Sequence, residues 1–479
     1  MQDRRRLLMD RSVPGRRGAT LPPCDVPLSK LPEDLLRRDL PLPEVSEPEI
    51  VRYFTHLARL NFGVDSGFYP LGSCTMKYNP RLHEELASLP GMAQVHPLQP
   101  PETVQGALRL MYELQEMLAE IAGLDATSLA PIAGAHGEMA GMQVIRAYQR
   151  DRGQGHRKTV IIPDSAHGTN PASAAMCGYG VEAVPADADG NMDLGRLRQV
   201  LSQDVAALMI TLPSTLGLFD RQIVQVCQEV HRAGGLVYGD GANLNALLGQ
   251  VKLGDLGFDV VHMNLHTTFS TPHGGGGPGA GPICLRRELA PFAPAPVVTR
   301  RDDRYELASP PRSIGRIAAF HGNFGVLLRA YAYIRLLGAQ GLRDVSRDAV
   351  LHANYLQERL RDVYPLAYHR RCMHEVVVSA SRFKRHGIRA LDIAKRLIDY
   401  GFHPPTMYFP LVVEEALMIE PTETESKETL DDFVEAMRAI AREAEEEPEL
   451  LRQAPRTTPV GRLDEARAAR HPDLRWRPG

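Results

Sequence analysis

The chain has 479 residues, of which 43 % are hydrophobic and 24 % charged, with a formal net charge of −3 at pH 7. That length can bury a large core, and the small net charge without a long run of one sign before the C-terminal region argues against nucleic-acid or membrane-surface partners. No stretch of about 18 apolar residues occurs, which excludes a membrane-spanning helix.

The basic N-terminus and the scattered cysteines favour a cytoplasmic protein. Residues 1–6 carry three arginines, but no apolar core follows them, which argues against a secretory signal. Six cysteines are spread along the chain without a Cys-x-x-Cys pair, and we interpret them as reduced thiols. Cys74, in a turn rich in glycine and serine, is the candidate for reactivity. We assign no metal ligands.

Residues 1–50 are predicted to form an extended N-terminal arm. Eight prolines between Pro14 and Pro48 block regular backbone pairing over this stretch. An arm of this kind usually wraps a partner subunit, and a floppy tail is the alternative.

A binding loop is predicted next, between Asn61 and Pro80. It combines glycines, hydroxyls and aromatic residues without helical spacing, which is typical of a surface loop that contacts a ligand. A structural turn is the alternative. The loop's candidate site residues are Ser73, Cys74, Thr75 and Lys77.

Residues 51–330 are predicted to form a large α/β domain. Apolar residues at helical spacing predict a helix over Val104–Ile121, ended by Gly123. A second helix is expected over Met139–Tyr148. The small-residue loop before it holds Ala135, His136 and Gly137, and a loop of this kind at a helix N-terminus offers free N–H groups that suit a phosphate.

Short apolar runs that alternate with helical segments indicate a mainly parallel sheet. The predicted strands are Thr159–Pro163, Val181–Pro185, Val205–Thr211, Gly235–Tyr238 and Val260–Leu265, with a helix over Gln222–Ala233. A smaller α/β domain is expected over residues 331–450, with strands at Glu375–Ser379 and Leu411–Ile419 and helices at 391–400 and 426–445. Residues 451–479 are predicted to be a tail.

Two of these strands end in polar turns that we expect to face one crevice. Ligands of open α/β sheets sit beyond the carboxyl ends of the strands. Asp240 follows the first strand and could pair with a ring nitrogen of a cofactor. The second turn leads into the glycine run Gly274–Gly277, which lets the backbone approach a ligand closely because no Cβ intervenes.

The sequence around these turns resembles fold-type-I pyridoxal-phosphate (PLP) enzymes. In detail it is similar to the glycine decarboxylase P-protein of the glycine cleavage system, in the form with a separate second subunit. The match covers essentially the whole chain, and is carried by the segments Asn61–Pro80, Asp240–Asn245, Phe269–Gly279, Gly401–Thr406 and Glu420–Ser426.

This resemblance implies a function, partners and roles for single residues. It implies PLP-dependent decarboxylation of glycine, with transfer of the aminomethyl group to lipoyl H-protein, by a heterodimer or α2β2 assembly with a first subunit. It implies that Asp240 pairs with the pyridine nitrogen and that His167 stacks on the ring. The remaining candidates for cofactor binding are Asn243, Ala135, His136, Gly137, Thr268 and Ser270, and His266 joins His167 as a catalytic candidate.

One departure from the family pattern concerns the lysine that holds PLP as a Schiff base. The family reads Asn-Leu-His-Lys-Thr-Phe-Ser, whereas this chain has Thr267 at the lysine position. A hydroxyl cannot form an imine, and positioned acid–base groups are worth about 10²- to 10⁴-fold in rate. Lys77 and Lys252 are the other lysines to consider, although Lys77, like His266, belongs to the ordinary pattern. Ser214 and Gly239 are further differences expected near the crevice.

Four hypotheses follow from this departure. First, the chain is a working P-protein second subunit. Second, it is a catalytically impaired paralogue that acts as a scaffold or regulatory subunit. Third, it has a repurposed site that binds PLP without a covalent bond, and fourth, Thr267 is an engineered or erroneous residue in a working enzyme. With Thr267 at this position, PLP, if bound, is expected to be held non-covalently.

Overall fold

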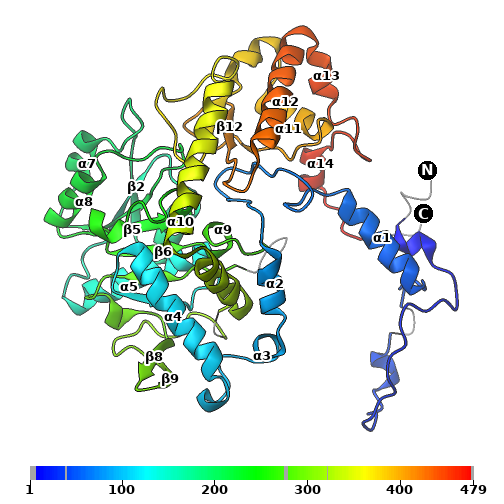
Figure 1. The fold of residues 1–479 in the computed structure, drawn as a ribbon, viewed down its shortest axis with the longest axis horizontal. Helices are drawn as coiled ribbons and strands as arrows, with labels where there is room; N and C mark the ends of the chain where they lie inside the picture. Colours follow the sequence, from blue (N-terminus) through cyan, green and yellow to red (C-terminus); the bar gives the residue numbers. More distant parts are fainter. Residues whose placement is uncertain (1–6, 38–39, 274–278, 321, 476–479) are drawn as a thin grey trace. The chain divides into compact units, whose positions relative to one another are not determined.

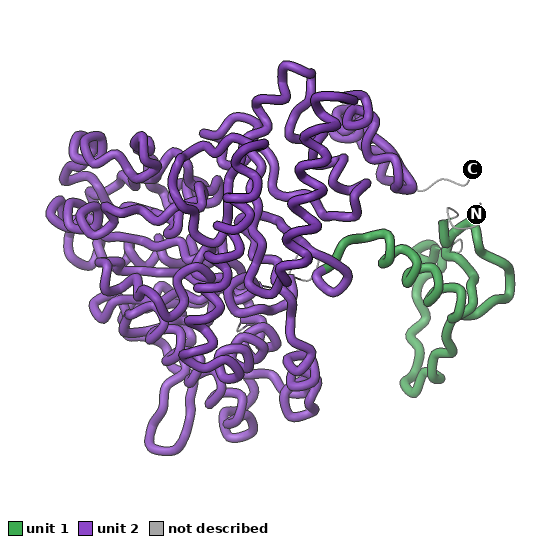
Figure 2. Tube along the Cα trace, turned by 45° about the horizontal axis from the view of Figure 1, so that its top comes forward, with its two compact units in different colours: residues 1–63 green, residues 64–479 purple. Residues whose placement is uncertain are grey.

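The computed structural model describes residues 7–37, 40–273, 279–320 and 322–475. The chain divides into two compact units, residues 1–63 and residues 64–479 (Figure 2). The predicted glycine run Gly274–Gly277 lies outside the described residues. No helix in the described ranges has the length and apolar character needed to cross a membrane.

The first unit contains one regular helix, α1 (Glu47–Arg59). Ser46 and Glu49 form a capping box at its N-terminus, which satisfies two of the helix's free N–H groups. Residues 7–37 and 40–46 hold only the short 3₁₀ turns Leu8–Arg11 and Glu33–Leu35 between extended segments. None of the residues of α1 is buried in this unit.

A seven-stranded sheet forms the centre of the second unit (Figure 1). The strand order is β1-β7-β6-β5-β4-β2-β3, and β2 to β6 run parallel while β7 is antiparallel to both its neighbours. The prediction of a mainly parallel α/β fold is therefore confirmed. The strands are β1 (Ala126–Ser128), β2 (Thr159–Pro163), β3 (Gly180–Val184), β4 (Val205–Thr211), β5 (Leu236–Gly241), β6 (Val260–Met263) and β7 (Ile283–Leu285).

Both faces of this sheet are buried, as continuous apolar strands require. Along β4, Leu208 and Ile210 enter one hydrophobic core, whereas Ala207 and Met209 enter another on the opposite face. Helices cover the sheet, and further short elements connect it: α2 (Arg81–Ala87), α3 (Pro90–Ala93), α4 (Gln105–Ala122), α5 (Gly134–Asp151), α6 (Thr169–Met176), α7 (Leu194–Val200), α8 (Ile223–Arg232), α9 (Leu265–Thr268) and the hairpin β8 (Val297–Arg301) and β9 (Arg304–Ala308).

The long helix α10 (Phe324–Leu360) leads from the large sheet to a smaller α/β region (Figure 1). Its helical geometry is broken at Gly338, where φ is +61°. A domain boundary placed after residue 330 falls inside this helix. The smaller region has an antiparallel sheet in the order β10-β12-β11 and its own hydrophobic core. Its elements are β10 (Val376–Ser379), α11 (Ala390–Asp399), β11 (Thr406–Met407), β12 (Ala416–Ile419), α12 (Lys427–Glu446) and α13 (Pro448–Gln453), followed by α14 (Glu465–Arg470).

Three predicted boundaries were wrong. Helix α5 begins at Gly134 rather than at Met139, so the predicted phosphate loop is the first turn of the helix. Asp240 lies within β5 rather than in the turn after it. Strand β12 starts only at Ala416, because the preceding Glu415 adopts φ +50°, a conformation that ends the extended backbone.

Candidate active site

Asp240 lies buried at the carboxyl end of β5, where its Oδ1 accepts a hydrogen bond of 2.9 Å from the backbone N–H of Ala242. The neighbouring strand β6 places His262 directly opposite, with its Nε2 3.4 Å from Asp240 Oδ1. The other ring nitrogen of His262 lies 2.6 Å from the Tyr238 hydroxyl. Burial, with the charges of Glu138 and Asp240, raises the pKa of Tyr238 well above its usual range. Tyr238, His262 and Asp240 therefore form a connected buried polar row, with Nδ1 of His262 at the Tyr238 hydroxyl and Nε2 facing Asp240.

Glu138, on α5, is a second buried carboxyl group near Asp240. Its oxygens accept hydrogen bonds from Thr169 at 2.8 Å and Ser173 at 3.2 Å. Burial, and then the charge of Asp240, raise the pKa of Glu138. Sequence reasoning missed Glu138 and His262. The available signals were an acidic residue among the small and apolar residues that open α5, and the parallel pairing that sets His262 beside Asp240.

The N-terminus of α5 is the predicted phosphate site. No side chain caps this helix, so the N–H groups of its first turn remain available, with the positive end of the helix dipole behind them. Gly137 differs from the prediction, because its N–H already bonds to the Ala133 carbonyl at 2.9 Å. Its lack of a side chain serves packing, since a Cβ would lie 2.5 Å from the Gly281 carbonyl oxygen. Ala135 is exposed, and His136 accepts a hydrogen bond from the Ile132 N–H at 3.2 Å.

Several buried polar atoms near the ends of β4, β5 and β6 have no hydrogen-bond partner among the residues that the structure describes. Buried polar groups are nearly always paired, so such atoms call for a ligand or an ordered water. They are Thr211 Oγ1, Asn243 Oδ1, Asn264 Oδ1 and Thr268 Oγ1. Ser270 differs from the prediction, because its hydroxyl already donates to the Tyr78 carbonyl at 2.6 Å.

His167 is exposed in the loop after β2. Its Nδ1 lies 3.1 Å from the Thr169 hydroxyl, which in turn donates to Glu138, so a continuous hydrogen-bonded path joins His167 to the buried acid. Its ring meets the Phe409 ring edge-on, at 5.5 Å between centroids. The stacking role that the resemblance implies for His167 stays a prediction.

Thr267 is buried in α9, and its hydroxyl reaches two backbone carbonyls. The distances are 3.1 Å to the Asn264 oxygen and 3.5 Å to the Ala242 oxygen. Because Ala242 follows Asp240 by two residues, position 267 faces the turn that comes directly after the predicted ring partner. The residue there offers a hydroxyl donor and no amine.

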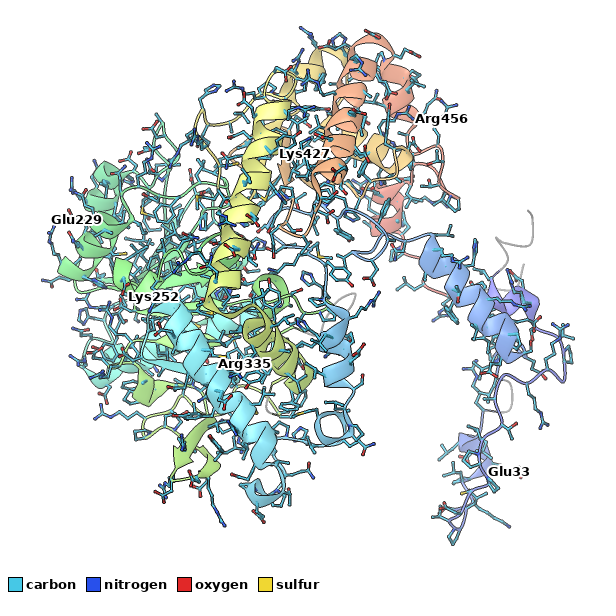
Figure 3. All side chains as sticks on the ribbon, viewed as in Figure 1. Glu33, Glu229, Lys252, Arg335, Lys427 and Arg456 are labelled. Atoms are coloured by element: carbon cyan, nitrogen blue, oxygen red, sulfur yellow. The ribbon has the colours of Figure 1, made fainter. Side chains whose placement is uncertain are left out.

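The two other candidate lysines, Lys77 and Lys252, have partners of their own. Lys77 is the only buried lysine among the described residues. Its ammonium donates to Asn245 Oδ1 at 2.7 Å, Tyr333 at 3.0 Å and Glu423 at 2.8 Å, so its three donors are used. Lys252, labelled in Figure 3, pairs at the surface with Glu120 at 2.6 Å.

His266, the second catalytic candidate, is a neutral imidazole at pH 7. Burial, and then the nearby His273, lower the pKa of His266 to about 4. Its Nδ1 accepts a 3.4 Å hydrogen bond from the Ala280 N–H, and the His273 ring meets it edge-on at 5.4 Å between centroids. A base of such low pKa accepts a proton only weakly near neutral pH.

The predicted substrate loop is held by two buried carboxylates that sequence reasoning missed. The backbone N–H of Ser73 donates to Glu375 Oε2 at 2.8 Å. Thr75 donates to Glu420 through its N–H at 3.0 Å and through its hydroxyl at 2.5 Å. Ser73 and Thr75 have φ values of +66° and +31°, so these bonds hold the loop in a conformation that L residues rarely adopt.

Cys74 does not have the character of a reactive thiol. Burial, and then the charges of Glu420 and Glu375, raise the pKa of Cys74 to about 12. A thiol rather than a thiolate therefore predominates near pH 7, and only the thiolate is a strong nucleophile.

Of the two other sequence differences, Gly239 does not belong to the crevice. A Cβ at this position would lie 2.7 Å from the Phe258 ring and 3.2 Å from Val261, inside the core. Ser214 is half-buried, and its hydroxyl accepts a hydrogen bond from the Leu216 N–H at 3.3 Å.

The fold is that of fold-type-I PLP enzymes. A solved structure of glycine decarboxylase (P-protein) of the glycine cleavage system, in inhibitor-bound form, superposes with a TM-score of 0.71 and 21 % identity, covering 86 % of this chain and 93 % of that one. A sphingosine-1-phosphate lyase from Burkholderia pseudomallei gives a TM-score of 0.63 at 14 % identity, covering 87 % and 93 %.

The sequence comparisons identify the family. The family model for the glycine cleavage system P-protein matches residues 25–308, and that for the glycine dehydrogenase C-terminal domain matches residues 345–455. A relative from Caldanaerobacter subterraneus is 57 % identical over 476 residues, covering 98 % of both chains, and one from Desulforamulus reducens is 57 % identical over 480 residues, covering 99 % of both. Both are named probable glycine dehydrogenase (decarboxylating) subunit 2. The chain therefore belongs to the glycine cleavage system P-protein family.

Proposed function

We propose that the chain is the PLP-binding second subunit of a glycine dehydrogenase (decarboxylating). It would act with a first subunit, remove the carboxyl group of glycine and pass the aminomethyl group to lipoyl H-protein. The observation that carries this proposal is the identity of 57 % over nearly the full length with relatives named as that subunit. None of the comparisons supports the scaffold alternative. A cytoplasmic location, expected from the cysteines, stays a prediction.

The residues around the carboxyl end of β5 offer partners to the ring and the phosphate of PLP. Asp240 offers a buried carboxylate to a protonated pyridine nitrogen, and the Tyr238–His262 pair lies behind it. The uncapped turn that opens α5 offers N–H groups to a phosphate, and Thr268 offers a hydroxyl that has no partner among the described residues. PLP, when bound, supplies an electron sink for the bond that breaks.

We infer that the chain holds PLP without a covalent bond. Thr267 presents a hydroxyl at the turn of Asp240, and the three donors of Lys77 are already used by Asn245, Tyr333 and Glu423. Binding would therefore depend on charge and hydrogen bonds at the ring nitrogen and the phosphate. Proton transfer in the crevice would depend on groups such as His167, since Thr267 has no activating base among its hydrogen-bond partners.

The exchange of ¹⁴CO₂ into glycine tests the function. The chain, its first subunit, lipoyl H-protein and PLP are combined, and labelled glycine is measured. We expect exchange above that of the mixture without this chain, and a loss of at least tenfold in Asp240→Asn. An intact assembly without exchange would contradict the proposed activity and favour the scaffold alternative.

A further inference from the structure

Three buried side chains of the smaller α/β region converge on one point. His374 and Glu375 precede β10, and Glu420 follows β12 at the same end of the antiparallel pair, because Val376 pairs with Ile419. One ligand atom from each side chain lies within 4.8 Å of the others. The three residues are at most 1 % exposed.

These side chains face one another without forming hydrogen bonds among themselves in the described structure. His374 Nε2 stands 3.8 Å from Glu420 Oε1, beyond hydrogen-bond distance. Both ring nitrogens of His374 are buried without a partner. The glutamates bond outward instead: Glu375 accepts from the Ser73 N–H and, at 3.5 Å, from the Asn243 side-chain amide, and Glu420 accepts from Thr75. A carboxylate oxygen with one donor still has a lone pair for a cation.

The local charge also favours a cation. Among the described residues no lysine or arginine forms an ion pair with Glu375 or Glu420, and Lys77 pairs with Glu423 instead, at 2.8 Å. Two buried carboxylates without a countercharge are unfavourable in a low-dielectric interior. One imidazole with two carboxylates is a ligand set that suits zinc and related divalent ions.

We propose that His374, Glu375 and Glu420 bind a divalent transition cation of the zinc or manganese class. The proposal is independent of PLP binding at Asp240. The ion would occupy the point that the three side chains share and would give His374 the partner that the protein does not supply. It would also fix the carboxylates that hold Ser73 and Thr75 at positive φ, so that it would order the loop over Cys74.

Metal titration of the untagged full chain tests this proposal. The protein is stripped with chelator, and ZnCl₂ and MnCl₂ are titrated in separate calorimetric experiments. We expect one tight site per chain for at least one of the two ions, and at least tenfold weaker binding in His374→Gln and in Glu420→Gln.

His83→Gln is the matched control. His83 is also a buried histidine, but it belongs to no cluster of metal-ligating groups in the described residues. This variant should bind the ion like the wild type.

Two results would overturn the proposal. One is a wild type without a saturable site for either ion; the other is a site whose affinity is unchanged in folded His374→Gln and Glu420→Gln variants. If those variants do not fold, anomalous diffraction from wild-type crystals grown with each ion tests whether the ion lies between the three side chains. A peak between the three side chains supports the site, and a water or nothing at that point in both crystals contradicts it.

Discussion

Position 267 decides how the crevice can hold a cofactor, because its side chain faces the turn after Asp240. The Thr267 hydroxyl lies 3.5 Å from the carbonyl oxygen of Ala242, two residues after Asp240. A longer side chain at position 267 would therefore start close to the carboxylate that is proposed to pair with the PLP ring nitrogen. Among the groups proposed to hold PLP, the Schiff-base lysine is the one that this chain replaces, by Thr267. A single substitution can supply it.

Thr267→Lys should therefore form a covalent adduct with PLP that borohydride fixes. The added amine would reach the crevice from α9, while Asp240 and the α5 N-terminus would still hold the ring and phosphate. Mass spectrometry after reduction would locate the adduct on residue 267. Thr267→Met, which has similar length without an amine, is the control and should give no adduct. Failure of the lysine variant to take up PLP would mean that the remaining site does not bind the cofactor.

Lys77→Met should destabilise the protein far more than Lys252→Met. Removing a buried cation leaves Glu423 charged and unpaired, which costs about 3–5 kcal/mol, whereas an exposed ion pair such as Lys252–Glu120 contributes about 0–1 kcal/mol. Urea unfolding of both variants gives the two free energies of unfolding. Equal and small losses would show that the Lys77 network is not a stabilising element.

The sequence allowed Asp240 to be found because it follows an apolar strand, but it did not reveal Glu138, Glu375 or Glu420. Glu375 and Glu420 are 45 positions apart and meet only through the pairing of β10 with β12. Local sequence pattern carries no information on such pairs. The same reason explains why no metal ligands were predicted.

At the scale of elements, α9 and the segment after it place two half-buried histidines side by side. His266 and His273 both have lowered pKa values, mainly because burial disfavours the charged form. In the unfolded chain a histidine titrates near pH 6.5. Below that pH the unfolded state takes up protons that the folded state cannot, so stability falls as the pH decreases from about 6.5 toward 4.

The free energy of unfolding should therefore decrease between pH 6.5 and 4 by less in His266→Asn than in the wild type. The lowered pKa of His266, about 4, limits the difference between the losses of unfolding free energy in the two proteins to about 3 kcal/mol. Urea unfolding at a series of pH values measures it. Parallel stability curves for the two proteins would show that His266 titrates normally in the folded state.

Elements with strong periodicity were predicted well, and those set by packing were not. Helix α4 and strands β2 and β4 were placed within a residue or two, because their apolar residues recur at the spacing of a helix or fill a buried strand. The start of α5 was missed because Gly134 and Gly137 read as a loop. Their missing Cβ atoms instead let the helix pack against Asn264 and the Gly281 carbonyl.

At the scale of the whole molecule, the first unit presents large apolar side chains that its own fold does not bury. They include Leu21, Leu28, Leu35, Leu42 and Phe54. Exposed apolar groups of this kind mark surfaces that contact other proteins. This supports the prediction that the N-terminal arm binds a partner subunit.

Deletion of residues 1–63 should weaken association with the first subunit and leave residues 64–479 folded. The second unit has its own sheets and hydrophobic cores. Sedimentation velocity of the mixed subunits measures association, and thermal unfolding checks the fold. A full-length Phe54→Ser, Leu57→Ser variant should weaken association in the same direction. Unchanged assembly in the deletion would show that the arm does not contact the partner.

Equilibrium dialysis with PLP, followed by borohydride reduction and mass spectrometry of the wild-type chain, tests the central claim most directly. The account predicts saturable binding of one PLP per chain, weakened at least tenfold in Asp240→Asn, and an unchanged protein mass after reduction. Absence of saturable binding, or a reduced adduct on Lys77 or another lysine, would contradict it.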